Sequence, residues 1–397
     1  MSHPERASAA RAEGQELLPL PLLILHFIAT GIVRYQEQHA HGREFDGDYP
    51  DPLQRGLDLL NALRYRQQLP LIKSVPHLLS WCRRPLGEWS LNLEALGREL
   101  VSEEVLLHGH LPSELCLELA CSTDEVEADL MERAFMEQVF SRCQQQGPQT
   151  YVALRRWLIE HPVVTAAELV RQLNASPELA QLQDLLREAY VEAPYEALYK
   201  GAFYCCPTCG ALLQPDHTGL RLLCSIERCY QMPLAVSALS AASGDGSQRR
   251  QPLRRLVPSE EVASLRRGLL WFVMWPGRAE LRLERRLREQ GALVEMWPDY
   301  DRYDLRVVVP RGTLAVDVKD WANPYLLARR VKPKGFFCEP GSQPYYVFPQ
   351  ERKTHQPDYV RAFKSAYDAL GGPSLEESGI KAEFEDDFVR EVLKLCR

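Results

Sequence analysis

The sequence lacks an uninterrupted apolar segment long enough to cross a membrane. Its longest apolar run, Leu17 to Val33, is interrupted by Pro19, Pro21 and His26, whereas a spanning helix needs about 20 apolar residues. Residues 1–15 mix Glu with Arg, unlike the positive flank of a signal peptide. We therefore expect a cytoplasmic protein with no membrane partner, in which residues 17–33 form a buried helix.

Positive charge is also scarce, except near the C-terminus. The 397 residues carry a net charge of -7, yet Arg249 to Ser365 hold 23 Lys and Arg against 14 Asp and Glu. The remaining residues hold 24 basic and 40 acidic groups. Only the C-terminal third is therefore suited electrostatically to a phosphate backbone.

Cysteines are not spread through the chain as a disulfide framework would require. Five of the 11 crowd between Cys205 and Cys229, which indicates one metal site in a reduced compartment. A Cys-x2-Cys pair and a Cys-x4-Cys pair, 15 positions apart, can supply four thiolates to a tetrahedral Zn²⁺, and this pattern resembles a zinc ribbon. The expected ligands are Cys206, Cys209, Cys224 and Cys229, with Cys205 or His217 as possible replacements for one of them.

A chain of this length predicts two or three folded units. We expect an α-helical domain over residues 1–200, because apolar residues there recur at helical spacing. A zinc ribbon follows at 201–236, a small and polar linker at 237–256, and an α/β or α+β domain at 257–397. Residues 151–173 predict two helices broken at His161-Pro162, with Thr165 as N-cap of the second. These are either ordinary bundle helices, which is the preferred interpretation, or a helix-turn-helix.

The last domain contains helical and strand patterns in close succession. Residues 265–274 and 280–290 predict helices, and residues 292–296, 305–309, 314–318 and 345–348 predict strands. The second and third strands are separated by Pro-Arg-Gly-Thr, which favours a hairpin. Residues 358–370 predict a further helix.

Charged residues of complementary type fall at matching positions of these elements. Asp317 and Lys319 lie two apart on one predicted strand and so project from the same face. Asp304 begins the strand that pairs with it. Glu280 and Glu284 lie one turn apart on the preceding helix. Such carboxylates can hold Mg²⁺ or Mn²⁺, which prefer oxygen ligands and activate a bound water for phosphodiester cleavage.

This pattern resembles the PD-(D/E)xK restriction-endonuclease-like superfamily, which has a helical Glu, an Asp that opens a strand and Asp-x-Lys on the next strand. The resemblance covers residues 265–365. It implies metal ligation by Asp304 and Asp317, a catalytic role for Lys319, and an auxiliary carboxylate at Glu280 or Glu284.

One departure from the family pattern concerns the first aspartate. Asp304 follows Tyr303, whereas Pro298-Asp299 supplies the literal Pro-Asp pair. We prefer Asp304 because the apolar strand starts immediately after it. Asp299 and Asp301 remain the alternatives.

Basic residues after the Asp-x-Lys strand could line a nucleic-acid groove. They are Arg329, Arg330, Lys332, Lys334, Arg352 and Lys353. The order of helical region, cysteine ribbon and nuclease domain also resembles nuclease subunits associated with prokaryotic PIWI-RE proteins, which act in defence together with a helicase. This resemblance implies protein partners such as a helicase or PIWI-like protein, and a DNA or RNA-DNA hybrid target. The function predicted is an Mg²⁺-dependent endonuclease, and the alternative is a non-catalytic nucleic-acid-binding or scaffold subunit.

Overall fold

A computed structural model describes residues 19–39, 49–121, 131–216, 219–230, 234–235 and 253–396. The predicted linker at 237–256 lies outside these ranges up to residue 252, and so does the alternative zinc ligand His217. The domain boundaries proposed from the sequence remain a prediction.

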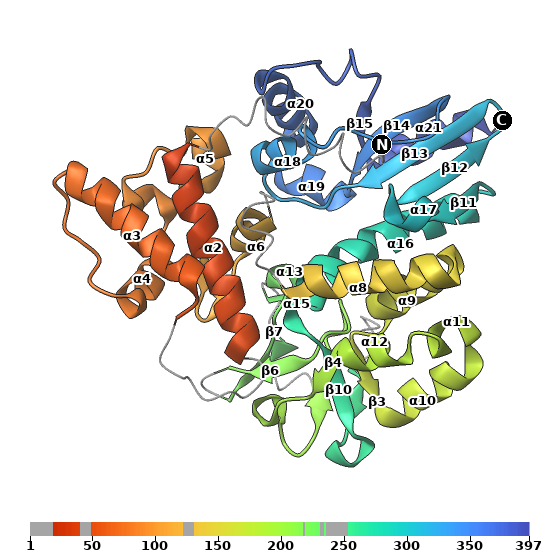
Figure 1. The fold of residues 1–397 in the computed structure, drawn as a ribbon, viewed down its shortest axis with the longest axis horizontal. Helices are drawn as coiled ribbons and strands as arrows, with labels where there is room; N and C mark the ends of the chain where they lie inside the picture. Colours follow the sequence, from red (N-terminus) through yellow and green to blue (C-terminus); the bar gives the residue numbers. More distant parts are fainter. Residues whose placement is uncertain are drawn as a thin grey trace.

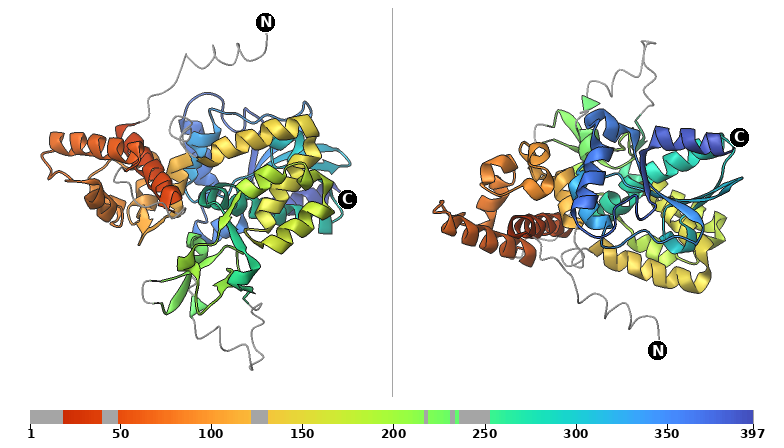
Figure 2. Two further views of the ribbon diagram at one scale, coloured as in Figure 1. Left: turned by 60° about the horizontal axis from the view of Figure 1, so that its bottom comes forward. Right: turned by 90° about the horizontal axis from the view of Figure 1, so that it is seen from above.

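The N-terminal region is mainly helical, as the apolar spacing predicted. Its helices are α2 (Leu20–His39), α3 (Asp51–Arg66), α4 (Val75–Trp81), α5 (Arg98–Val101), α6 (Glu114–Cys121), α8 (Met131–Gln146), α9 (Pro148–Glu160), α10 (Ala166–Ala175), α11 (Pro177–Ala180) and α12 (Gln183–Glu188). A short hairpin of β1 (Leu107–His108) and β2 (Leu111–Pro112) precedes α6. Helices α2 to α5 form a lobe at one side of the molecule (Figure 2).

The apolar run near the N-terminus is a core helix. Ile24, Leu25 and Ile28 of α2 are fully buried. Helix α3 lies close against α2, because a Cβ on Gly56 would come within 2.6 Å of the Ile28 side chain. Among the described residues, the structure has no helix that is long and apolar enough to span a membrane.

The break at His161-Pro162 contains a strand that the sequence pattern did not predict. Strand β3 (Val163–Thr165) separates α9 from α10. Thr165 caps α10 as expected, in a reciprocal capping box with Glu168. Strand β10 (Val262–Leu265) pairs antiparallel with both β3 and β4 (Tyr190–Glu192). Residues from both sides of the predicted linker therefore share one sheet.

The cysteine-rich segment is built from short strands. Strands β6 (Leu213–Pro215), β7 (Arg221–Cys224) and β8 (Leu234–Ala235) form an antiparallel sheet. Strand β5 (Phe203–Tyr204) pairs with β9 (Arg255–Leu256), and the short helix α13 (Glu227–Tyr230) follows β7. The hairpin expected between the two cysteine pairs is present as β6 and β7.

The C-terminal region contains a five-stranded mixed sheet in the order β11-β12-β13-β14-β15. Its strands are β11 (Leu293–Met296), β12 (Leu305–Val309), β13 (Gly312–Val318), β14 (Ser342–Phe348) and β15 (Lys381–Phe384). The first three are antiparallel, and β13, β14 and β15 are parallel. The predicted hairpin is therefore present, with Val309 opposite Gly312.

Helices cover both faces of this sheet (Figure 1). The helices of this region are α16 (Trp275–Glu289), α17 (Pro298–Asp301), α18 (Pro324–Val331), α19 (Gln350–His355), α20 (Tyr359–Ala369) and α21 (Glu385–Leu395). Because successive side chains of a strand alternate in direction, Tyr345 and Val347 join the core that includes α16 and α21, whereas Tyr346 and Phe348 join a core with α18 and α20. The two helices predicted at 265–274 and 280–290 differ from the structure. Helix α15 (Arg267–Leu269) continues through a π-helical turn at Leu270–Met274 directly into α16.

Candidate metal site and candidate nuclease site

The four expected thiol ligands converge in the structure. The sulfur atoms of Cys206, Cys209, Cys224 and Cys229 all lie within 4.8 Å of one another, and all four residues are buried. The Sγ atoms of Cys209 and Cys224 are 3.4 Å apart. Zn–S bonds of about 2.3 Å in a tetrahedron place the sulfur atoms a little under 4 Å apart, so the cluster could hold a metal ion such as zinc. Cys205 is buried but lies outside this group.

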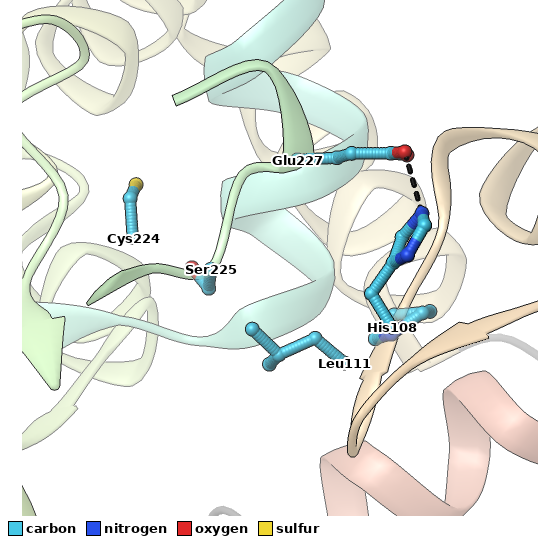
Figure 3. Close-up of a pocket in the computed structure, with 6 residues that line it drawn as sticks. His108, Leu111, Cys224, Ser225 and Glu227 are labelled. Atoms are coloured by element: carbon cyan, nitrogen blue, oxygen red, sulfur yellow. Dashed lines mark hydrogen bonds and ion pairs between the residues drawn. The ribbon is translucent and has the colours of Figure 1, made fainter. Parts of the chain in front are cut away.

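The cysteine segment is attached to the helical region beside this cluster. Figure 3 shows a small pocket lined by Cys224, Ser225 and Glu227 on one side and by His108 and Leu111 on the other. His108 Nε2 and Glu227 Oε1 are 2.7 Å apart, and this bond raises the pKa of His108. The contact is therefore a charge-assisted link between β1 and α13.

The carboxylates and lysine expected from the Asp-x-Lys pattern lie at one end of the β12–β13 hairpin. Leu305 of β12 pairs with Val316 of β13, so continuing the register by one residue places Asp304 opposite Asp317. Asp304 is 6% exposed, and its Oδ2 accepts a hydrogen bond of 2.6 Å from the backbone N–H of Val318. Lys319 follows directly after β13, and its ammonium forms an ion pair with Asp317.

Burial and mutual repulsion determine the electrostatics of this cluster. Burial, with repulsion from Glu280 and Asp317, raises the pKa of Asp304 well above its usual range. Burial opposes the charged form of Lys319, but Asp317 and Asp304 outweigh it and raise its pKa. Lys319 is therefore a cation at neutral pH, suited to stabilising negative charge.

The two candidate glutamates have different neighbours in the structure. Glu280 is 3% exposed, the charge of Lys319 acts on it, and its own charge acts on both Asp304 and Lys319. Glu284 instead pairs with Arg156 at 2.7 Å and with Arg288 at 3.0 Å. We therefore prefer Glu280 as the auxiliary carboxylate.

The alternative first aspartates do not lie opposite Asp317. Asp299 has a side chain that is 52% exposed and is 3.4 Å from Arg302. Asp301 pairs with Arg155 of α9 and accepts a hydrogen bond of 3.1 Å from Tyr151. Neither replaces Asp304 opposite Asp317.

The fit of a divalent cation to these residues depends on their donor atoms and on their arrangement in space. Carboxylate oxygens are the donors that Mg²⁺ and Mn²⁺ prefer, so the residue types fit. The arrangement does not. Within the described ranges, the four cysteines are the one set of three or more ligand residues whose donor atoms all lie within 4.8 Å of one another. The carboxylates of the nuclease cluster are instead paired with internal cations, namely Lys319 on Asp317 and Arg155 on Glu280.

The basic residues expected to bind nucleic acid differ in their exposure and in their bonding partners. Arg329, Arg330, Lys332 and Lys334 lie in or just after the second half of α18, where Lys332 donates to the Tyr367 carbonyl at 2.6 Å. The side chain of Lys353 is 45% exposed and lies 3.8 Å from Asp387. Arg352 is 5% exposed and bonded to Glu114 and Asp320, so its guanidinium is taken up by carboxylates and is not presented to a phosphate.

Arg155 is the part of the site that the sequence interpretation missed. It lies 125 positions before Glu280, in a helix of the N-terminal region. Its position next to Glu280 depends on the packing of α9 against α16. No spacing or motif in the sequence signals this contact.

Family models match two segments of this chain, and one of these segments contains the mixed sheet with its carboxylate and lysine cluster. Residues 277–396 match the family described as REase associating with pPIWI_RE. Residues 24–165 match the family described as pPIWI_RE three-gene island domain Y. The expected association with PIWI-RE systems and with a restriction-endonuclease-like domain is thereby confirmed. No curated protein and no solved structure matches the chain.

Proposed function

We propose that this chain is a metal-dependent endonuclease that cleaves phosphodiester bonds in nucleic acid, with DNA as the preferred target, within a PIWI-RE defence island. The observation that carries the proposal is the convergence of Asp304, Asp317 and Lys319 at one end of the β12–β13 hairpin. This hairpin lies inside the segment that matches the REase family. The protein partners proposed are a helicase or a PIWI-like protein of the same island, as the resemblance implies.

The residues have separate roles in this reaction. Once the internal cations Lys319 and Arg155 have left these carboxylates, Asp304, Asp317 and Glu280 would hold Mg²⁺ or Mn²⁺, which supplies an activated water and charge neutralisation when bound. Lys319 remains protonated and stabilises the negative charge that develops on the reacting phosphate. The backbone N–H of Val318 fixes the Asp304 carboxylate. Structural zinc at the four cysteines would stabilise the intervening segment and take no part in catalysis, because a closed set of four thiolates leaves no open position.

The basic residues in and just after α18, namely Arg329, Arg330, Lys332 and Lys334, are proposed to contact the nucleic-acid backbone together with Lys353. Many phosphate contacts share the binding free energy, so the loss of one side chain weakens binding only modestly. Cleavage and binding are therefore separable by mutation.

The test is cleavage of labelled DNA, RNA and RNA-DNA hybrid, single and double stranded, with and without Mg²⁺ or Mn²⁺. Asp317→Ala should abolish cleavage because it removes a metal ligand. Lys319→Ala should lower the cleavage rate by about 10² to 10³-fold, as for the loss of one group that stabilises the transition state. Both variants should retain most of their nucleic-acid affinity.

Asp299→Asn is the matched control, because Asp299 is an exposed aspartate of the same domain and is expected to leave cleavage unchanged. If Asp317→Ala and Lys319→Ala cut as well as the parent at saturating metal, the assignment of cleavage to this site is wrong. If the parent binds nucleic acid but cuts none of the substrates with either metal, the alternative of a non-catalytic binding or scaffold subunit is favoured.

A further inference from the structure

A guanidinium from the helical region occupies the carboxylates of the nuclease site. Arg155 lies in α9, within the segment that matches domain Y. Its Nη2 is 2.9 Å and 3.0 Å from the two carboxylate oxygens of Glu280, and 3.9 Å from Asp304 Oδ1. Its Nη1 pairs with Asp301 and donates to the Tyr151 hydroxyl at 3.1 Å. One fixed positive charge thus lies among three carboxylates.

The surroundings hold this guanidinium in place. The Arg155 side chain is 11% exposed, and its guanidinium carbon is 5.0 Å from the centroid of the Trp297 ring. The Trp297 indole N–H donates to Glu280 Oε2 at 2.5 Å. Both oxygens of Glu280 are therefore bonded to protein groups.

The segment from Trp297 to Asp301, whose two end residues contact the same guanidinium, has an unfavourable backbone conformation. Trp297, Asp299, Tyr300 and Asp301 have φ angles of 47°, 51°, 59° and 73°, a left-handed region that non-glycine residues rarely adopt. The Tyr300 ring packs edge-on against Phe140 of α8 and Tyr151 of α9. Contacts with α8 and α9 thus accompany the strained conformation, as expected if the surrounding structure imposes it.

The direction of the guanidinium distinguishes a blocking role from a catalytic one. An arginine that acts on a phosphate presents its N–H donors to the substrate side. The terminal N–H groups of Arg155 point instead to Glu280, Asp301 and the Tyr151 hydroxyl. Its Nε is buried without a hydrogen-bond partner.

We propose that Arg155 is an intramolecular cation that occupies the metal-binding carboxylates of the nuclease site, so that domain Y holds the nuclease in a form that excludes divalent metal. This proposal rests on the proposed function, because it concerns the regulation of the same site. Because Arg155 Nη2 contacts both oxygens of Glu280, its positive charge occupies the position from which a divalent cation would bind that carboxylate. The metal-competent form therefore requires α9 and Arg155 to withdraw from Glu280.

The test measures metal binding separately from cleavage. The full-length, zinc-loaded protein is titrated with Mn²⁺, and free Mn²⁺ is followed by electron paramagnetic resonance. If the closed form holds at least about nine-tenths of the molecules, Arg155→Gln raises the apparent Mn²⁺ affinity by about tenfold or more. Adding Asp304→Asn to Arg155→Gln should remove this gain.

Arg156→Gln is the matched control, because Arg156 is adjacent in α9 but pairs with Glu284. It should bind Mn²⁺ as the parent does. If Arg155→Gln fails to fold, Arg155→Met is the neutral variant to compare with Arg155→Lys, which keeps the positive charge. The Mn²⁺ affinity of Arg155→Lys should rise much less than that of the neutral variant.

Each outcome separates the regulatory proposal from the proposed function. If the parent and Arg155→Gln bind Mn²⁺ with equal affinity, and this binding depends on Asp304, the blocking role of Arg155 is overturned and the proposed nuclease function is unaffected. Weaker binding in Arg155→Gln also overturns it. Tighter, Asp304-dependent binding without cleavage of any substrate supports the blocking role and overturns the nuclease function. Binding that does not depend on Asp304 in either protein overturns both.

Discussion

The substitution Arg352→Met tests whether a buried charge cluster holds the parts of this chain together. Arg352 of α19 donates to Asp320 at 2.9 Å and to Glu114 at 2.5 Å. Arg228 of α13 contacts the same two carboxylates, Glu114 at 2.6 Å and Asp320 at 2.7 Å. The four residues therefore join the helical region, the cysteine segment and the nuclease-like region.

The cost of this substitution follows from burial. Removing one partner of a buried ion pair costs about 3 to 5 kcal/mol, because it leaves an uncompensated charge. Arg228 still faces both carboxylates, so we expect a loss near the lower limit, about 3 kcal/mol. The matched control Lys353→Met removes a cation from the next position of the same helix, with a side chain that is 45% exposed. It should cost about 0 to 1 kcal/mol, as exposed pairs do.

The assay is urea denaturation followed by tryptophan fluorescence and by circular dichroism. Two probes are needed because a chain with several folded regions need not unfold in one step. Arg352→Met should lower the midpoint of the transition clearly below that of Lys353→Met. Equal midpoints for the two variants would refute the argument that this cluster couples the regions.

Three further predictions address the metal site, the auxiliary carboxylate and pH. The parent should contain about one zinc per molecule, and Cys206→Ser with Cys209→Ser should release it; full zinc retention, measured by atomic absorption, would contradict the assignment of the ligands. Glu280→Gln should slow cleavage much more than Glu284→Gln. If the cleavage assay shows the larger loss for Glu284→Gln, then Glu284 is the auxiliary carboxylate and Glu280 is not. Burial lowers the pKa of His26 from 6.5 to about 4. The folded state therefore keeps His26 neutral, whereas the unfolded chain takes up a proton below pH 6.5. Through this residue alone, the free energy of unfolding should fall by roughly 3 kcal/mol between pH 7 and pH 4. Urea denaturation of His26→Gln should show a correspondingly weaker pH dependence, and an unchanged dependence would show that His26 is not responsible.

Local patterns predicted several parts of the fold because their causes are local. The hairpin of β12 and β13 follows from two β-branched runs around a turn. The capping of α10 by Thr165 depends on Glu168, three residues away. The four cysteines converge because the members of each pair are close in sequence, Cys224 ending β7 and Cys229 lying in α13, and the β6–β7 hairpin brings the two pairs together.

Other features could not be predicted because they depend on distant residues. Strand β3 has three residues, too few for an alternating pattern, and it is stabilised by β10, nearly 100 positions later. Arg352 was expected to line a nucleic-acid groove, but Glu114 and Asp320 from other elements bind its guanidinium. The choice between Glu280 and Glu284 was open because both lie on one helix and only their neighbours differ.

By itself, the sequence determined the identity and order of the reactive groups, namely the four thiols and the Asp-x-Lys strand with its preceding aspartate. Those groups are set by short spacings and by strand alternation, which operate within a few residues. Only the tertiary structure decided what each group faces. Lys319 pairs with Asp317 as its neighbour on the strand, whereas Arg155 reaches Glu280 through the packing of a helix more than a hundred residues away. Because an ion pair depends on distance in space and on burial, not on separation along the chain, the charge state and accessibility of the site belong to the folded molecule.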